Sequence, residues 1–371
     1  MKGAWLFRIG AAAVVAALFM WWTGQPGRLI EAGLVLLDVR AGRDGASPLR
    51  EQVPQPRRLV LPGGDLYEPG QGARAGVVLV PGATPAGKDD RAVVAFAQSL
   101  ARARFRVLVP EIPGLRGLRL GSADSEPIAA ALVELSARQE PRQPLGLVAV
   151  SYAAGPAMVA LAGPGAAERV DFAVLVGGYH DIETLLTYVT TGHFRDRPGE
   201  PWQRREPLAP GKWVFLQSYA ERLDSPGDRA LLSEMAWRRL ADRDADIAAL
   251  EAGLGPEGQA VASLLENRDP EKVPALLAAL PSAIKEELAR LDPKRLPLGA
   301  LKARFVLIHG RGDPFIPESE SRAFARALFP GQASLYLANG LEHVVPRPAG
   351  PGDLVTLLRA TDRILQLRDG R

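Results

Sequence analysis

The chain of 371 residues is 47% hydrophobic and 23% charged, which excludes an intrinsically disordered chain and a protein built mainly of membrane-spanning helices. It contains no cysteine, so disulfide scaffolds, thiol nucleophiles, iron–sulfur clusters and cysteine-ligated zinc are excluded. The 45 basic and 42 acidic residues leave a net charge of only +3, spread along the chain, and we expect no nucleic-acid partner.

The first segment, residues 1–24, is predominantly apolar. Residues 4–23 are long enough, as a helix rising about 1.5 Å per residue, to cross a hydrocarbon layer of roughly 30 Å if Arg8 reaches the interface. The Trp21–Trp22 pair suits a membrane interface, and its bulk disfavours a signal-peptidase site. We therefore expect an uncleaved single-pass membrane anchor, with a cleaved signal peptide as the alternative. The basic residues Lys2 and Arg8 predict that the body lies on the exported, periplasmic or extracellular side.

A connector, residues 25–56, follows, which is either a helix lying on the membrane or a tether. Beyond it, short β-branched apolar runs alternate with segments of helical periodicity. The strand-like runs are Leu59–Leu61, Val77–Val80, Val107–Val109, Leu147–Val150, Phe172–Val176, Phe305–Ile308 and Ser334–Leu337. The helical segments are Arg91–Ala103, Pro127–Arg138, Ala153–Leu161, Ser319–Leu328 and Asp353–Leu367. This alternation predicts an α/β fold with a mostly parallel sheet covered by helices on both faces.

One stretch, residues 181–300, breaks the alternation. It is rich in Ala and Leu at helical spacing, and its one strand-like run is Trp213–Leu216. We expect an inserted helical domain here, dividing the α/β core into residues 57–180 and 301–371. The clearest predicted helices of the insertion are Gly227–Ala241, Glu257–Leu265 and Pro281–Leu291.

A serine follows one of the predicted strands directly. The strand Leu147–Val150 runs into Ser151, and small residues then open a helix. This is the pattern of a nucleophile elbow, in which a sharp strand-to-helix turn exposes a strained serine. The usual glycines two positions before and after the serine are replaced by Ala149 and Ala153. The same residues also fit a serine that simply caps a helix.

An aspartate and a histidine follow two later strands. Asp313 lies in a Gly-bearing turn after Phe305–Ile308, and His343 follows Ser334–Leu337. The carboxyl ends of parallel strands meet at one edge of the sheet, where open α/β sheets place their sites. The order serine, aspartate, histidine is that of a nucleophile, an orienting acid and a base in hydrolases of this architecture.

These segments together resemble the α/β-hydrolase superfamily, and more loosely its membrane-anchored bacterial members. The resemblance covers about Leu59–Tyr179 and Leu301 to the end of the chain. It implies that Ser151 attacks an acyl carbonyl, His343 moves the proton and Asp313 orients His343. Asp181 is the alternative acid.

The same resemblance identifies an oxyanion loop after the strand Val77–Val80. The family commonly has a His-Gly pair there, and Pro81 stands in place of that histidine. The backbone N–H groups of Ala83 and Tyr152 are the implied donors to a developing oxyanion, and Thr84 is the alternative to Ala83.

The four histidines lie far apart in the sequence and form no metal-ligand pair, so we expect neither a metal nor a cofactor. His180 and His309 are expected to be structural. The predicted activity is that of a serine hydrolase acting on a small-molecule or lipid-like carboxylic ester. An acyltransferase or a peptidase would use the same triad, and a membrane-tethered binding protein would keep the scaffold without catalysis.

Overall fold

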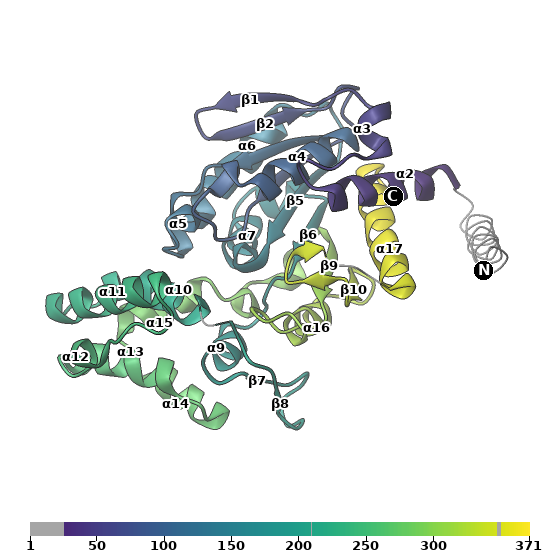
Figure 1. Cartoon of the computed structure of the whole chain (residues 1–371). Coiled ribbons are helices and arrows are strands. Elements are labelled where there is room, and N and C mark those ends of the chain that lie inside the picture. Colours follow the sequence, from purple (N-terminus) through teal and green to yellow (C-terminus); the bar gives the residue numbers. More distant parts are fainter. Residues whose placement is uncertain (1–25, 209, 347–349) are drawn as a thin grey trace, which may run out of the picture.

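The computed structural model describes residues 26–208, 210–346 and 350–371. Its centre is an eight-stranded sheet with the order β1-β2-β4-β3-β5-β6-β9-β10 (Figure 1). The strands β3 to β6, β9 and β10 are parallel, while β1 and β2 form an antiparallel hairpin at one edge. This confirms the predicted mostly parallel sheet. The strands are β1 (Arg57–Leu61), β2 (Gly64–Glu68), β3 (Ala75–Val80), β4 (Phe105–Pro110), β5 (Leu145–Val150), β6 (Phe172–Val176), β9 (Arg304–Gly310) and β10 (Ala333–Ala338).

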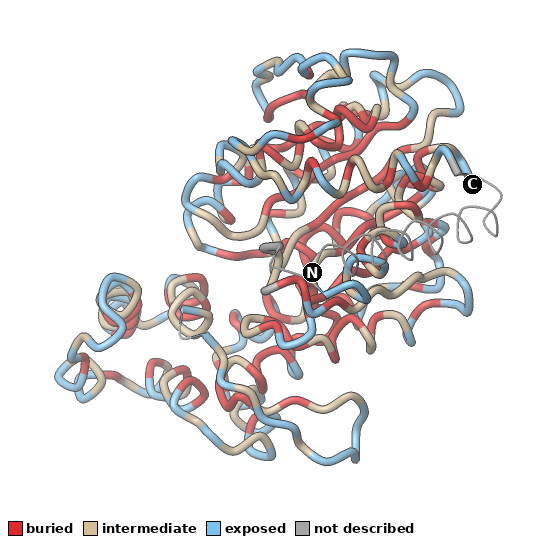
Figure 2. The backbone as a smooth tube through the Cα atoms, turned by 45° about the vertical axis from the view of Figure 1, so that its right-hand side comes forward, coloured by how far each residue is buried: buried red, intermediate tan, exposed pale blue. Residues whose placement is uncertain are grey.

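Alternating side chains of the central strands fill two separate hydrophobic layers. On β3, Val78 and Val80 enter one layer, whereas Val77 and Leu79 enter the other. Both sets are buried because helices cover both faces of the sheet, as Figure 2 shows. One face is covered by α6 (Ser125–Ala137), α7 (Ala154–Ala162) and α16 (Ser319–Ala327). The other is covered by α2 (Pro26–Ala41), α4 (Arg91–Arg102) and α17 (Pro351–Arg368).

Helices also make up most of the chain between β6 and β9, as predicted for residues 181–300. They gather at one end of the molecule, at the lower left of Figure 1, around a hydrophobic cluster of their own. The helices are α9 (Ile182–Thr191), α10 (Pro210–Tyr219), α11 (Pro226–Ala241), α12 (Ala248–Glu251), α13 (Pro256–Glu266), α14 (Val273–Ala279) and α15 (Ser282–Arg290), with a small hairpin of β7 (His193–Phe194) and β8 (Gln203–Arg204).

The strand-like run Trp213–Leu216 is helical, so that interpretation was wrong. It forms the middle of α10, and Phe215, Leu216 and Tyr219 are buried at helical spacing in the cluster of the insertion. Burial among neighbouring helices outweighs the local strand preference of Trp, Val and Phe. The boundaries of the predicted domains remain predictions.

The connector is built into the fold from Pro26 onward. Its helix α2 packs on α4 and α17, and the carboxylate of Asp38 is fully buried beneath it. That carboxylate accepts hydrogen bonds from Ser47 and Ser99 and forms ion pairs with Arg50 and Arg102. Burial alone would raise the pKa of Asp38, but these partners outweigh it and lower the pKa below its usual value. Asp38 therefore joins α2, α3 (Pro48–Gln52) and α4.

Within the described ranges, every helix is too short or too polar to cross a bilayer. The predicted membrane anchor, residues 1–24, lies outside the described residues. The anchor therefore stays a prediction.

We expect Asp38→Ala to lower the free energy of unfolding by about 3–5 kcal/mol, because it leaves the nearly buried cation of Arg102 without its partner. Urea denaturation followed by circular dichroism measures the change. Asp44→Ala is the matched control, since Asp44 forms an ion pair with Arg91 in which both side chains are exposed. Equal losses in the two variants would contradict a structural role for the buried network.

Candidate active site

Ser151 occupies the predicted strand-to-helix turn. The strand β5 ends at Val150, a single 3₁₀ turn spans Ser151–Ala153, and α7 begins at Ala154. The backbone of Ser151 is left-handed, with φ of 60°, a conformation that costs a residue with a side chain about 1–2 kcal/mol. The turn therefore holds Ser151 in the strained geometry of a nucleophile elbow.

Small residues lie next to this turn, both along the chain and across from it. Ala149 and Ala153 are fully buried. A β-carbon added to Gly155 would lie 1.8 Å from the hydroxyl of Tyr179, and one added to Gly178 would lie 2.7 Å from the β-carbon of Ala154. The space beside the turn is thus taken up by the side chains of Tyr179 and Ala154, which leave room only for glycine at positions 155 and 178; sequence reasoning did not single out these two glycines.

The structure brings Ser151, His343 and Asp313 together from three separate segments. The Nε2 of His343 lies 2.6 Å from the Oγ of Ser151, and its Nδ1 lies 2.7 Å from the Oδ2 of Asp313. An ionised carboxylate only accepts hydrogen bonds, so Nδ1–H donates to Asp313 and Nε2 accepts from the Ser151 hydroxyl. These contacts form a continuous serine–histidine–aspartate relay.

The Asp313 carboxylate is fully buried at the turn after β9. Its Oδ1 accepts hydrogen bonds from the N–H groups of Phe315 and Ile316, at 2.8 and 3.1 Å. Burial alone would raise the pKa of Asp313, but hydrogen bonding to His309 and His343 outweighs it and holds the pKa well below its usual range. Asp313 is therefore ionised at neutral pH.

His343 is held between an aromatic ring and the loop after β6. The ring centroid of Phe315 lies 4.8 Å from that of His343, and a β-carbon added to Gly177 would lie 3.4 Å from the imidazole. Gly177 has a φ of 62°, which favours glycine, and its backbone passes close to both His343 and Asp313. Sequence reasoning did not assign this role to Gly177. Two glycines directly after a strand were the available signal.

The other sequence candidates lie elsewhere. The carboxylate of Asp181 accepts a hydrogen bond from the N–H of Glu183 at the start of α9 and pairs with Lys294 at 2.7 Å, so it caps a helix. His309 is fully buried, with Nδ1 at 2.7 Å from the Ser321 hydroxyl and Nε2 at 2.9 Å from a backbone carbonyl. These contacts support the structural role expected for His309.

The predicted oxyanion loop lies beside the serine. A β-carbon added to Gly82 would lie 3.5 Å from that of Ser151, so the segment that carries Ala83 passes next to the nucleophile. Tyr152 follows Ser151 directly in the 3₁₀ turn. Thr84 is engaged with Asp90, its hydroxyl lying 3.4 Å from the carboxylate. The assignment of Ala83 and Tyr152 as oxyanion donors stays a prediction.

A buried carboxyl group holds the loop between β6 and α9 in place. Glu320, on α16, accepts hydrogen bonds from the N–H groups of His180 and Asp181 and from the hydroxyl of Thr184. Burial raises the pKa of Glu320 to about 7, despite these donors. Burial likewise lowers the pKa of His180 to about 4, so that ring is neutral at neutral pH.

A search of the described parts of the chain finds no group of three His, Cys, Asp or Glu side chains placed to hold a metal ion. The three side chains of the relay are of the kinds that carry out proton transfer and nucleophilic attack.

Similar architectures occur among solved hydrolases. A candidate hydrolase from Legionella pneumophila matches with a TM-score of 0.51 at 13% identity, over 82% of this chain and 83% of its own. The rice cell wall degrading esterase LipA from Xanthomonas oryzae matches with a TM-score of 0.50 at 15% identity, over 83% and 84%.

An acylaminoacyl peptidase from Pyrococcus horikoshii matches with a TM-score of 0.44 at 13% identity, and this chain spans 41% of its length. No protein-family profile and no curated protein sequence matches this chain. The sheet order and the first two likenesses define the class: this chain has the α/β-hydrolase fold.

We expect Gly155→Ala to destabilise the protein by about 1–3 kcal/mol, because the new methyl group would displace the buried Tyr179 and break its 2.9 Å hydrogen bond to the Leu291 carbonyl. Urea denaturation measures this. In the control Gly352→Ala, the helical glycine has open space around it, so better helix propensity should leave stability unchanged or raise it by up to about 1 kcal/mol. Changes of the same sign in both variants would refute the steric argument.

We expect Glu320→Gln to remove a pH dependence of stability. The pKa of Glu320 is about 7 in the folded protein and has its ordinary value of 4.5 in the unfolded chain. Between these two pH values the folded protein binds more protons than the unfolded chain, so its stability falls as the pH rises. The loss is about 3 kcal/mol in all and levels off above pH 7. Chemical denaturation at pH 4.5, 6 and 8 measures it.

The variant Glu286→Gln, at an exposed carboxylate, should follow the wild-type curve of stability against pH. If Glu320→Gln also kept the wild-type slope, the assigned titration would be wrong.

Proposed function

We propose that this protein is a serine hydrolase that cleaves carboxylic esters through an acyl-enzyme. The observation that carries the proposal is the continuous relay from the Ser151 hydroxyl to His343 at 2.6 Å and from His343 to Asp313 at 2.7 Å. Folding alone does not require three such side chains to converge from β5, β9 and the turn after β10.

In the first half of the reaction, the Oγ of Ser151 attacks the ester carbonyl carbon while Nε2 of His343 takes the serine proton. The carbonyl oxygen becomes an oxyanion, for which the backbone N–H groups of Ala83 and Tyr152 are the donors. The tetrahedral intermediate then collapses with cleavage of the carbon–oxygen ester bond. The alcohol leaves with the proton from His343, and the acyl group remains on Ser151.

In the second half, water attacks the acyl-enzyme and His343 accepts a proton from it. The carbon–Oγ bond breaks, His343 returns the proton to Ser151, and a carboxylic acid is released. The ionised Asp313 stabilises the positive imidazolium of His343 in both halves. Its pKa well below the usual range supports this role at neutral pH.

The surroundings of Ser151 support an apolar substrate portion. Tyr152 and Tyr219 approach to 3.3 Å between hydroxyls, and the rings of Tyr152 and Tyr179 lie 5.6 Å apart. Burial raises the pKa of all three phenols, so they stay neutral. The helices of residues 181–300 supply Tyr219, and we assign them the role of a cap that shapes the ester pocket. The LipA likeness, to an esterase, agrees with this substrate class.

The location of the protein is a second part of this proposal. The apolar run at residues 4–23 supports a membrane anchor with the hydrolase body on the exported side, which would place it near lipid-like esters.

Covalent labelling by a fluorophosphonate tests the nucleophile. We expect Ser151→Ala to abolish labelling, and His343→Ala and Asp313→Asn each to slow it by at least about a hundredfold, because the serine loses its base or the base loses its orientation. Gel fluorescence against time gives the rates.

Asp181→Asn is the matched control, since this carboxylate caps α9, and its labelling rate should stay close to wild type. A folded wild-type protein that ignores the probe, or labelling that survives in Ser151→Ala, would refute the proposal. Product analysis with p-nitrophenyl esters and an added alcohol then separates hydrolysis from acyl transfer.

A further inference from the structure

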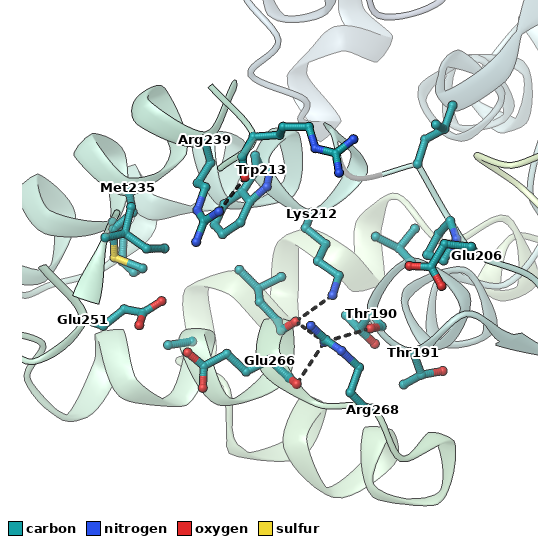
Figure 3. Close-up of a pocket in the computed structure, with 18 of the residues that line it drawn as sticks. Thr190, Thr191, Glu206, Lys212, Trp213, Met235, Arg239, Glu251, Glu266 and Arg268 are labelled. Atoms are coloured by element: carbon teal, nitrogen blue, oxygen red, sulfur yellow. Dashed lines mark hydrogen bonds between the residues drawn. The ribbon is translucent and has the colours of Figure 1, made fainter. Parts of the chain in front are cut away.

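The helical insertion contains a cavity of about 430 Å³ that the proposed reaction does not use. Helices α9, α10, α11 and α13 contribute to its wall, and Ser151, Asp313 and His343 do not. Figure 3 shows Lys212 extending into the middle of this cavity, with Arg239 and Trp213 on one side and Arg268 below.

Three cations in the wall lack a carboxylate partner. Among the residues that the structure describes, no carboxylate oxygen lies within 4.0 Å of the charged groups of Lys212, Arg239 or Arg268. Arg239 stands over the ring of Trp213 at 5.5 Å, and its Nε is buried without a hydrogen-bond partner. Burial and the nearby Arg268 lower the pKa of Lys212 to about 8. Glu206 acts in the opposite direction, but it does not offset burial and the like charge of Arg268.

Backbone carbonyls account for only part of this charge. Lys212 donates to the Leu265 carbonyl at 3.1 Å, and Arg268 donates to carbonyls at the end of α13 and to that of Thr190. A helix C-terminus carries about half a negative charge, which is less than the two cations placed on it. Arg239 lies in the last turn of α11 and donates to the Arg243 carbonyl, while its Nε has no partner.

Two acidic residues of the wall lie near these cations without forming an ion pair: Glu206 raises the pKa of Lys212 against the effect of burial, and Arg239 lowers that of Glu251. Burial and the neighbouring Glu266 raise the pKa of Glu251, and both side chains lie on the other side of the cavity from Lys212 in Figure 3. The remaining wall is partly polar, with Thr190, Thr191, Arg204 and Arg243, and partly apolar, with Trp213, Met235 and Ile247. The cavity thus combines a cationic end with a hydrocarbon-lined part.

We propose that this cavity binds an amphipathic anion, whose acidic head group contacts Lys212, Arg239 and Arg268 and whose hydrocarbon part lies against Trp213, Met235 and Ile247. A carboxylate or a phosphate monoester supplies the same head-group chemistry. The site is independent of Ser151, so it stands whether or not the proposed hydrolysis occurs.

Calorimetric titration of the full chain, in non-ionic detergent with a matched detergent blank, tests this proposal. The probes are octanoate, octyl phosphate, octanol and inorganic phosphate. We expect octanoate or octyl phosphate to bind and octanol and inorganic phosphate to bind at least about tenfold more weakly, because each lacks one of the two parts of the ligand. The anion that binds more tightly shows whether the head group is a carboxylate or a phosphate.

The variants Lys212→Met and Arg239→Met should each lower the affinity for the anion about tenfold or more, and Arg239→Lys should retain part of the affinity. Arg238→Met is the matched control, because Arg238 directly precedes Arg239 in α11 and pairs with Glu234, with both side chains exposed. Ser151→Ala should bind as wild type does. The proposal fails if no anion binds the wild-type chain, if Lys212→Met and Arg239→Met bind as tightly as Arg238→Met, or if Ser151→Ala loses binding.

Discussion

The buried carboxylate of Asp313 is the constraint on which the candidate site depends. A fully buried charge is stable only when donors surround it, and here the N–H groups of Phe315 and Ile316 and the rings of His343 and His309 do so. Each donor comes from a segment that must be in place before the carboxylate can remain ionised. The turn after β9, the loop of His343 and the interior position of His309 are therefore parts of one electrostatic arrangement.

Two of the five non-glycine residues with a left-handed backbone, among those that the structure describes, belong to the relay. Ser151 and His343 both have left-handed backbones, with φ of 60° and 55°. Neither is a glycine, so the surrounding fold must supply the free energy that holds them there. The parallel strands on both sides of β5 hold the end of that strand in place, and the glycines at 155, 177 and 178 leave room for the side chains of Tyr179, His343 and Ala154.

The sequence predicts those parts of the molecule that depend on local patterns. Continuous apolar runs marked the parallel strands, and their carboxyl ends marked Ser151, Asp313 and His343, which the structure brings into contact. The strand β2 was missed because its residues Gly64–Glu68 include two acids, and Asp65 is buried only through its pairing with Arg58 and Lys88. The contacts of Glu320 with residues about 140 positions away could not be predicted, since no local pattern encodes them.

The helical insertion contacts the candidate site directly. Two residues of this region, Tyr188 on α9 and Arg205, contact the backbone carbonyl of Asp313 at 3.3 and 3.1 Å. Arg205 also pairs with Glu318, which fixes it against the core. Two residues after Tyr188, the carbonyl of Thr190 accepts a hydrogen bond from Arg268 at the cavity. A single helix therefore contacts both the turn that holds the acid and the cationic cavity, and the position of the insertion bears directly on the geometry of Asp313.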